Sequence, residues 1–373
     1  MSQDVRSAYS AHPTTSEAAR EVLEQLAGSE PAVIVFFHGV VHDGRTVAAA
    51  LSGRYPQAKI LGCSSCGEFS DLGYGAGGVS AVALGSGKIE KAASAMFSVE
   101  GDLEANVQGA MDALAREFGD VRQLDPSTHV GLILVDGALM KEEKVNEALG
   151  NACPLLTFVG GSAGDDLKFE RTPVHDATRS KSGHAVVVLM RVNGPFHILK
   201  TCNYAPTEKM YKVTRADPER RRVVELDGRP AAEVYAEALG IPVAQLDTPT
   251  MLLNPLSIVI EGKPWLRTVF GAEDGELILV CGVEEGHELC LPKNREIVED
   301  TRQALREASA RFGGPATGGV LFNCAARKLE VEIKDVAEPY YAVFKDFPVA
   351  GVHTHGESWI GHMNQTLTGL LFA

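Results

Sequence analysis

The segment "AKILGCSSCGEF" (residues 58–69) decides the fold, because in it an apolar strand runs directly into a glycine-bracketed turn that ends on an acidic residue. Upstream lie another apolar strand, "AVIVFF" (Ala32–Phe37), and a helical stretch that contains Thr46–Leu51. Downstream follows the strand "VSAVAL" (Val79–Leu84). Strand–helix–strand spacing of this kind predicts a parallel βαβ crossover, and the uninterrupted apolar strands predict a sheet that is buried on both faces.

The same order of elements occurs twice more along the chain. The second copy contains "HVGLILVDGAL" (129–139), a helix around residues 144–149, the turn segment "PLLTFVGGSAGDD" (154–166) and the strand "HAVVVLM" (184–190). The third copy contains "GGVLFNCAARK" (318–328), a helix before Pro348, the turn segment "PVAGVHTHGES" (348–358) and the strand "TLTGLLF" (366–372). We therefore predict an α/β protein of repeated βαβ units with buried sheets, whose turns at the carboxyl ends of parallel strands are expected to face a ligand.

A different pattern separates the second copy from the third. The segment "VVELDGRPAAEVYAEALG" (223–240) predicts a strand, an Asp-Gly turn and an amphipathic helix with a glycine cap, and short strands with turn signals follow over residues 257–283. This predicts a smaller α+β region inserted before the last repeat. The polar connection 203–222 is the expected domain boundary. The predicted organisation is a leader or helix in residues 1–30, a ligand-sensing domain in 31–205 and a second domain in 223–373.

The composition predicts a cytoplasmic protein with reduced thiols. Seven cysteines in 373 residues are an odd and low number, which argues against a disulfide framework. The formal charge of −14, with 35 Lys+Arg against 49 Asp+Glu, argues against a nucleic-acid partner. Residues 1–20 lack the apolar stretch of a signal peptide, and the longest apolar runs fall short of the about 20 residues that span a bilayer, so we expect no membrane insertion.

In combination, these motifs resemble the FIST family, bacterial sensory domains that are described as an N-terminal and a C-terminal half. The matching segments are "ILGCSSCGEF", "ILVDGAL", "VGGSAGDDLKF", "ELDGRPAAEVYAEALG", "LFNCAAR" and "PVAGVHTHGESWIGHMNQTLTGLLF". The resemblance runs from about Ala32 to Phe372 and implies an intracellular module that senses a small-molecule ligand. It also implies that a chain without an appended kinase-like segment signals in trans, to a partner such as a histidine kinase or a cyclic-dinucleotide enzyme. A homodimer is an open alternative.

The resemblance leaves the cofactor unknown, with haem and zinc as alternatives. Some stand-alone family members are similar to haem-binding nitric-oxide sensors. The final turn departs from the family pattern, because it reads G-V-H-T-H-G-E where aromatic residues are usual, as in G-F-F-T-Y-G-E. The candidate axial ligands of haem iron are the imidazoles of His353 and His355 in this turn and of His362 in the segment that follows.

The cysteines of the first turn have three interpretations. Cys63 and Cys66 form a C-x-x-C pair, but a redox pair calls for a helix N-terminus and the sequence that follows is a glycine-rich loop. With His353 and His355, which share a face of an extended segment, they would complete a tetrahedral zinc site. Alternatively, they are small residues packed in a tight turn.

The turns also supply the candidate ligand-binding residues. Their carboxylates are suited to the ammonium of an amino-acid-like ligand, and their N–H groups to its carboxylate; alternatively, the carboxylates accept backbone N–H bonds and hold the turns. An arginine after the third strand offers a planar fork for an anionic group, or caps a helix or pairs on the surface. The predicted ligand-binding set is Cys63, Ser64, Ser65, Glu68, Gly161, Ser162, Asp165, Asn323, Arg327 and Glu357.

Catalysis is the weaker hypothesis. The segment "GGSAGD" (160–165) lacks the G-x-S-x-G spacing of a nucleophile elbow, and Ser162 has no histidine near it in the sequence. We therefore assign no catalytic residue and favour a sensor over an enzyme. A metal-dependent or acid–base enzyme, which would use the cysteines, histidines and carboxylates of the turns, is the further alternative.

Overall fold

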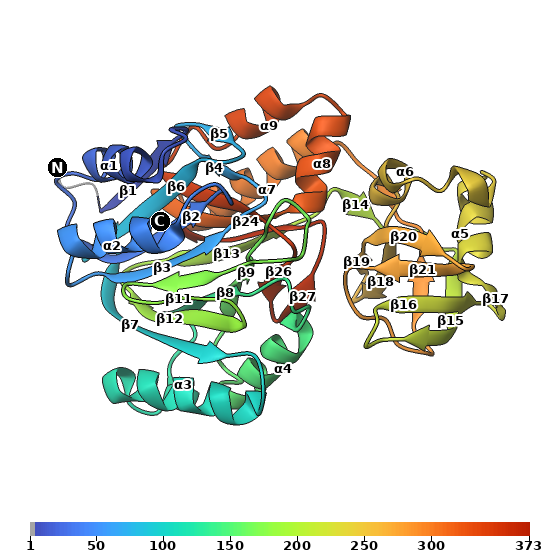
Figure 1. Ribbon diagram of the computed structural model, residues 1–373, viewed down its shortest axis with the longest axis horizontal. Coiled ribbons are helices and arrows are strands. Elements are labelled where there is room, and N and C mark those ends of the chain that lie inside the picture. The colour runs from blue at the N-terminus through green and yellow to red at the C-terminus, as the bar shows by residue number, and fades with distance from the viewer. Residues whose placement is uncertain (1–3) are drawn as a thin grey trace.

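The computed structural model describes residues 4–373, and most of the chain forms three six-stranded sheets (Figure 1). Each sequence copy supplies an edge strand, two parallel strands joined by helical structure, a short hairpin and a final strand. Repeat 1 comprises β1 (Val5–Ser10), α1 (Thr15–Gln25), β2 (Pro31–His38), α2 (Gly44–Arg54), β3 (Lys59–Ser64), β4 (Glu68–Ser70), β5 (Tyr74–Gly75) and β6 (Val79–Gly85). Repeat 2 comprises β7 (Ile89–Ser98), α3 (Leu103–Phe118), η1 (Val121–Gln123), β8 (His129–Val135), α4 (Glu142–Ala152), β9 (Phe158–Ser162), β10 (Val174–Asp176), β11 (Ser180–Lys181) and β12 (His184–Val192).

Repeat 3 is interrupted after its first strand. It comprises β13 (Phe196–Thr201), α7 (Ile297–Phe312), β24 (Gly318–Cys324), α8 (Ala325–Ile333), α9 (Ala337–Ala342), β25 (Val349–Thr354), β26 (Glu357–Trp359), β27 (Gly361–Met363) and β28 (Leu367–Phe372). The two central strands of every repeat pair in parallel, β2 with β3, β8 with β9 and β24 with β25. This confirms the predicted α/β class and its βαβ crossovers.

Each repeat gives its hairpin to the sheet of another repeat. The β4–β5 hairpin of repeat 1 extends the sheet of repeat 3, β10–β11 of repeat 2 extends that of repeat 1, and β26–β27 of repeat 3 extends that of repeat 2. The exchanges close into a ring, so no sheet is complete within its own repeat. The turn before each hairpin must therefore cross from one sheet to the next, which brings the three turns together at the centre of the ring.

The strands are apolar on both faces because each sheet separates two hydrophobic layers. Along β2, Val33, Val35 and Phe37 face a core that all three sheets share, whereas Ile34 and Phe36 face α1 and α2. In the same way α3 and α4 cover the outer face of the sheet of repeat 2, and α7, α8 and α9 cover that of repeat 3. The body is thus a three-sided arrangement of sheets with helices outside.

The inserted region forms a separate lobe between β13 and α7, drawn at the right of Figure 1. Its core consists of its own strands and α5, together with Met251 of α6. This confirms the predicted α+β region, although it interrupts the last repeat after β13 and does not precede that repeat. The region comprises β14 (Tyr204–Ala205), β15 (Met210–Asp217), β16 (Arg222–Leu226), β17 (Arg229–Pro230), α5 (Ala231–Leu239), η2 (Val243–Gln245), α6 (Thr248–Leu253), β18 (Leu256–Ile260), β19 (Lys263–Arg267), β20 (Val269–Glu273), β21 (Glu276–Leu279), β22 (Glu288–Cys290) and β23 (Lys293–Asn294).

Membrane insertion through a helix requires a long apolar helix. Among residues 4–373, no helix is both long and apolar enough to cross a bilayer.

Candidate functional site

The three turns that the sequence singled out meet and bond to one another. Gly161 lies at a crowded point of this junction, because an added Cβ atom would come within 2.6 Å of the Thr354 side chain. The turns are buried at the centre of the body. Backbone bonds join each pair of turns, and they include those from Cys66 N to His353 O (2.9 Å), from Gly164 N to Ser64 O (3.0 Å) and from Ser162 N to Gly356 O (2.9 Å).

Glu68 binds its own turn to the last strand of repeat 1. Its carboxyl group is fully buried and accepts bonds from the Ser65 hydroxyl and from the Gly78 N–H (2.8 Å). Ser65 has a second acceptor in the His38 carbonyl at 3.1 Å, although a hydroxyl has only one hydrogen to give. Burial raises the pKa of Glu68 to about 7, and a protonated carboxyl group would itself donate to the Ser65 oxygen.

Glu357 repeats this arrangement in repeat 3. It is also fully buried, and it accepts from the Thr354 hydroxyl (2.7 Å) and from the hydroxyl (2.7 Å) and N–H (3.2 Å) of Thr366. Thr354 likewise has a second acceptor, the carbonyl of Asn323 at 3.4 Å. Burial raises the pKa of Glu357 to about 8. Both glutamates therefore hold turns together, which was the alternative to a ligand-binding role.

In repeat 2, a different residue supplies the carboxylate that holds the turn. Glu68 and Glu357 each open a hairpin strand, but the corresponding residue of repeat 2, at the start of β10, is Val174. The carboxylate comes instead from Asp136, which accepts from the Gly183 N–H and from the Thr172 hydroxyl, both at 2.6 Å. Asp165 lies nine residues before the start of β10 in a longer loop, and it organises that loop by accepting the N–H groups of residues 169, 170 and 171.

His353 has a complete set of hydrogen-bond partners. Its Nδ1 lies 3.0 Å from the Asn323 amide nitrogen and its Nε2 lies 2.9 Å from the Tyr341 hydroxyl. The ring is fully buried, and burial, with the nearby charges of Lys328 and Arg327, holds the pKa of His353 well below its usual range. A metal or haem iron could bind this imidazole only at the expense of one of these bonds.

The Arg327 side chain is also fully buried and hydrogen-bonded inside the protein. Its guanidinium group donates to Asn323 Oδ1 (3.0 Å), Asn203 Oδ1 (2.7 Å) and the Thr301 hydroxyl (2.9 Å), and no part of the residue is exposed. Asn203 begins the inserted region and in turn donates to the buried carboxylate of Glu330. Arg327 therefore joins β24, α7 and the start of the inserted region, and it does not face a cavity.

The other candidate metal ligands do not form one site. His355 stacks on Phe169 (ring centroids 4.1 Å apart), lies 3.5 Å from the Asp165 carboxylate, and faces a cavity of about 20 Å³, which is close to the size of one water molecule and far too small for a porphyrin. Burial raises the pKa of the Cys66 thiol to about 12 and that of Cys63 well above its usual range. Of the predicted zinc and haem ligands, His353 is therefore already hydrogen-bonded through both ring nitrogens, and His355 faces a cavity too small for a porphyrin.

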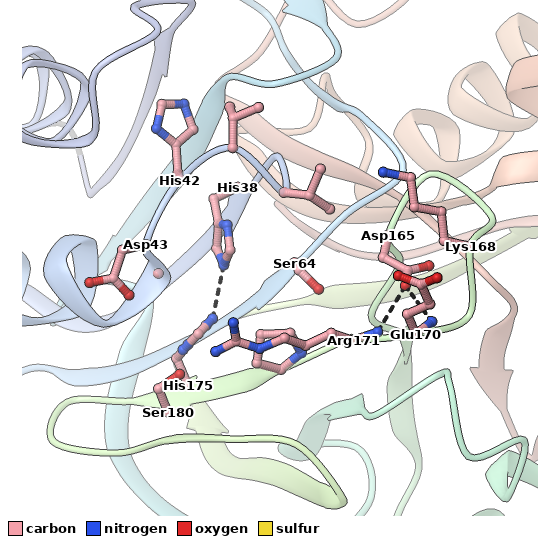
Figure 2. Close-up of a pocket in the computed structure, with 14 residues that line it drawn as sticks. His38, His42, Asp43, Ser64, Asp165, Lys168, Glu170, Arg171, His175 and Ser180 are labelled. Carbon is pink, nitrogen blue, oxygen red and sulfur yellow. Dashed lines mark hydrogen bonds between the residues drawn. The ribbon is translucent and has the colours of Figure 1, made fainter.

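A cavity lies beside the central turns, at the carboxyl ends of the parallel strands β2 and β3 (Figure 2). Its volume is about 440 Å³. Two residues of the predicted ligand-binding set, Ser64 and Asp165, line it. Figure 2 shows Ser64 between a pair of histidines and the loop that carries Asp165. The remaining lining residues are His38, Val40, Val41, His42, Asp43, Gly44, Lys168, Glu170, Arg171, Pro173, His175 and Ser180.

A histidine pair forms one wall of this cavity. The Nε2 atoms of His38 and His175 are 2.9 Å apart, and His38 Nδ1 lies 2.9 Å from the Gly39 carbonyl oxygen. His38 must therefore donate through Nδ1 and accept at Nε2 from His175, which leaves His175 Nδ1 as an acceptor without a partner among the described residues. Burial lowers the pKa of His38 to about 4, and burial together with the neighbouring His38 ring and the Arg171 charge lowers the pKa of His175 further. Both rings are neutral at pH 7.

The lining of the cavity carries charges of both signs. Of its three carboxylates, Asp43 caps α2 through the Arg45 N–H, Asp165 holds its own loop, and Glu170 forms no ion pair within residues 4–373. Lys168 and Arg171 likewise form no ion pair within this range, so they remain available to an anionic group. The N-terminus of α2 adds the positive end of a helix dipole.

Sequence reasoning did not single out His38, His175, Lys168 or Arg171. His38 had a visible signal, because it ends the apolar run "AVIVFFH" at the same position where Asn323 ends the run of the third repeat. His175 had none, since its hairpin joins the sheet of another repeat.

Comparison with known families identifies the class of this protein. A model of the FIST N domain matches residues 31–229, and a model of the FIST C domain matches residues 231–359. The chain therefore belongs to the FIST family, whose domains are sensory domains of signal transduction.

Comparison with solved structures found matches of low similarity. One is the crystal structure of a chorismatase at 1.08 Å, with 12% identity and a TM-score of 0.35 over 98% of this chain and 97% of that one. Another is a cyanuric acid hydrolase, with 10% identity and a TM-score of 0.35 over 99% of both chains. Similarities this low do not transfer an activity. The comparison with curated proteins found no match.

Proposed function

We propose that this FIST protein is a sensor that binds a small carboxylate-bearing metabolite in the cavity at the ends of β2 and β3. This proposal rests on an open cavity of about 440 Å³ whose lining includes two cationic side chains, Lys168 and Arg171, that form no ion pair within residues 4–373. Cavities of roughly 300–1,000 Å³ are typical of small-molecule sites. The guanidinium group of Arg171 suits a carboxylate, because its two N–H groups match the two oxygens.

Two buried polar atoms support a ligand of amino-acid or hydroxy-acid type. The Ser64 hydroxyl is 1% exposed and has no hydrogen-bond partner among the described residues, and the same holds for His175 Nδ1 in a ring that is equally buried. Buried polar atoms without a partner are costly, so a ligand that bonds to them gains affinity. Ser64 can donate to a ligand oxygen, and His175 Nδ1 can accept from an ammonium or hydroxyl group.

Replacing Arg171 with alanine should weaken this binding by about 10- to 100-fold, because a hydrogen bond to a charged group contributes about 1.5–3 kcal/mol. The measurement is calorimetric titration of the purified protein with amino acids, hydroxy acids and dicarboxylates, preceded by a thermal-shift screen of the same compounds. Arg116→Ala, on the distant helix α3, is the matched control and should bind like the wild type. If none of these compounds binds the wild type, or if Arg171→Ala binds them equally well, the proposal fails.

Signalling in trans, to a partner such as a histidine kinase or a cyclic-dinucleotide enzyme, would start at the mouth of the cavity. The loop between β2 and α2 carries Val40 and Val41, which line the cavity and are 39% and 65% exposed. Exposed apolar side chains next to a ligand offer a partner a surface that changes with occupancy.

Ligand binding should therefore slow amide hydrogen exchange in residues 39–43 and 168–172, at least severalfold, because both segments border the cavity. The measurement is exchange followed by mass spectrometry, with and without a ligand that passes the titration. The inserted lobe serves as the internal reference. Protection confined to that lobe would contradict the assignment of the cavity.

A further inference from the structure

Three side chains outside the cavity meet where both halves of the protein adjoin. Glu142 and Glu143 begin α4 in the first half, and His362 lies on β27 in the second. One potential ligand atom from each of the three lies within 4.8 Å of the others, and among residues 4–373 they are the one such group of His, Cys, Asp and Glu. Arg221, which precedes β16 of the inserted region, reaches the two glutamates from the third side.

The charges of this cluster are not balanced by Arg221 alone. Two carboxylates face one guanidinium group, which leaves one negative charge, and the Glu142 side chain is only 3% exposed. The Arg221 nitrogen NH2 lies close to three acceptors, Glu142 Oε2 (2.8 Å), Glu143 Oε2 (2.6 Å) and the Met140 carbonyl (3.0 Å). It carries two hydrogens, so one acceptor remains without a full bond. An uncompensated buried charge is costly, which calls for a further cation.

His362 is the independent observation that points to a ligand. The residue is 7% exposed, and neither of its ring nitrogens has a hydrogen-bond partner among the described residues. A buried imidazole with two unpartnered nitrogens, within 4.8 Å of two carboxylate oxygens, can use a lone pair to coordinate an ion.

We propose that Glu142, Glu143 and His362 bind one divalent transition-metal ion. Two carboxylate oxygens and one imidazole nitrogen are a donor set that Zn²⁺, Co²⁺ and Mn²⁺ accept, and water would complete the coordination. The ion supplies the positive charge that Arg221 does not, and it gives His362 a partner. Because its ligands come from α4 and β27, the ion links repeat 2 to repeat 3 beside the inserted lobe.

The test is metal uptake by the full chain after removal of bound ions with a chelator. We expect one Co²⁺ per chain, seen as ligand-field absorption, and a matching calorimetric Zn²⁺ titration at pH 7. His362→Ala and Glu143→Gln should each weaken binding by about tenfold or more, since each removes one of three ligands. His129→Ala is the matched control, because this half-buried histidine lies at the start of β8 and bonds to the Asp125 carbonyl.

A melting curve adds a readout that does not depend on metal spectroscopy. Zn²⁺ should raise the melting temperature of the wild type and of His129→Ala by a few degrees, but not that of Glu143→Gln, whose partly exposed side chain makes misfolding a small risk. The inference is overturned if the wild type takes up no Co²⁺ or Zn²⁺. It is also overturned if both ligand variants bind like the wild type, because the ion then lies elsewhere, for example on cysteines.

Discussion

Replacing Arg327 with methionine should lower the free energy of unfolding by about 3–5 kcal/mol, which is the usual cost of removing one partner from a buried charged network. Methionine keeps the apolar stem but leaves the side-chain oxygens of Asn203 and Thr301 without the guanidinium donor, and leaves Asn323 Oδ1 with the Tyr340 hydroxyl alone. None of these atoms can turn to water, since Asn323, Asn203, Thr301 and Arg327 are all fully buried. The loss should extend to the junction with the inserted lobe, because Asn203 also holds Glu330.

Urea denaturation, followed by circular dichroism and by tryptophan fluorescence, checks this prediction. Arg302→Met is the matched control, since Arg302 pairs on the surface with Glu299 and its side chain is 39% exposed. An exposed ion pair contributes about 0–1 kcal/mol, so this control should stay close to the wild type. A loss of less than about 1 kcal/mol in Arg327→Met would show that the network contributes little to stability.

The second large effect is a loss of stability as the pH rises from 5 to 9. The folded protein holds protons on Glu357 and Glu68, whose pKa values burial raises to about 8 and about 7 from an ordinary value of 4.5. Between the unfolded and the folded pKa the folded state binds more protons than the unfolded state, so stability falls as the pH rises through this window. The contribution of Glu357 is fully present below about pH 4.5 and should lose on the order of 2–4 kcal/mol by pH 9.

Glu357→Gln isolates this contribution from the other titrating groups. Its amide can donate to the Thr354 oxygen, as the protonated carboxyl group does, while Thr354 donates to the Asn323 carbonyl. We therefore expect the variant to resemble the wild type at pH 5 and to exceed it in stability at pH 9. The measurement is the free energy of unfolding of both proteins across this range. Curves that run parallel from pH 5 to pH 9 would show that Glu357 does not titrate in this window.

Much of the architecture could be predicted from the sequence patterns of the strands and turns. Runs such as Ala32–Phe37 are apolar at every position, and this indicates a sheet covered on both faces, as the alternation of Val35 towards the shared core and Phe36 towards the helices shows. The prediction could not include the exchange of hairpins, because strand pairing between repeats leaves no local signal. For that reason the alignment of the acidic turns placed Asp165 beside Glu68 and Glu357, whereas Asp136 has their structural role.

The residues of the candidate site, too, could be predicted from the sequence only in part. Ser64 and Asp165 were selected from the turns and do line the cavity, but the cationic side chains that favour an anion lie on a loop without a recognisable motif. His353 and Arg327 looked like ligands because polar residues at strand ends commonly are. Their partners, Tyr341 and Asn203, are distant in sequence or lie beyond a domain boundary, and only the folded chain brings them together.

The sequence by itself determined the α/β class, the three repeats, the inserted region and the family, because these depend on local periodicity and on motifs that a linear chain displays. Only the tertiary structure decided what "LGCSSCGEF" does. Its glycines and Glu68 allow the turn to cross between sheets, its cysteines are buried and protonated, and only Ser64 reaches the cavity. The reason is that burial and pairing over long sequence distances determine which polar groups are already hydrogen-bonded inside the protein and which remain available to a ligand.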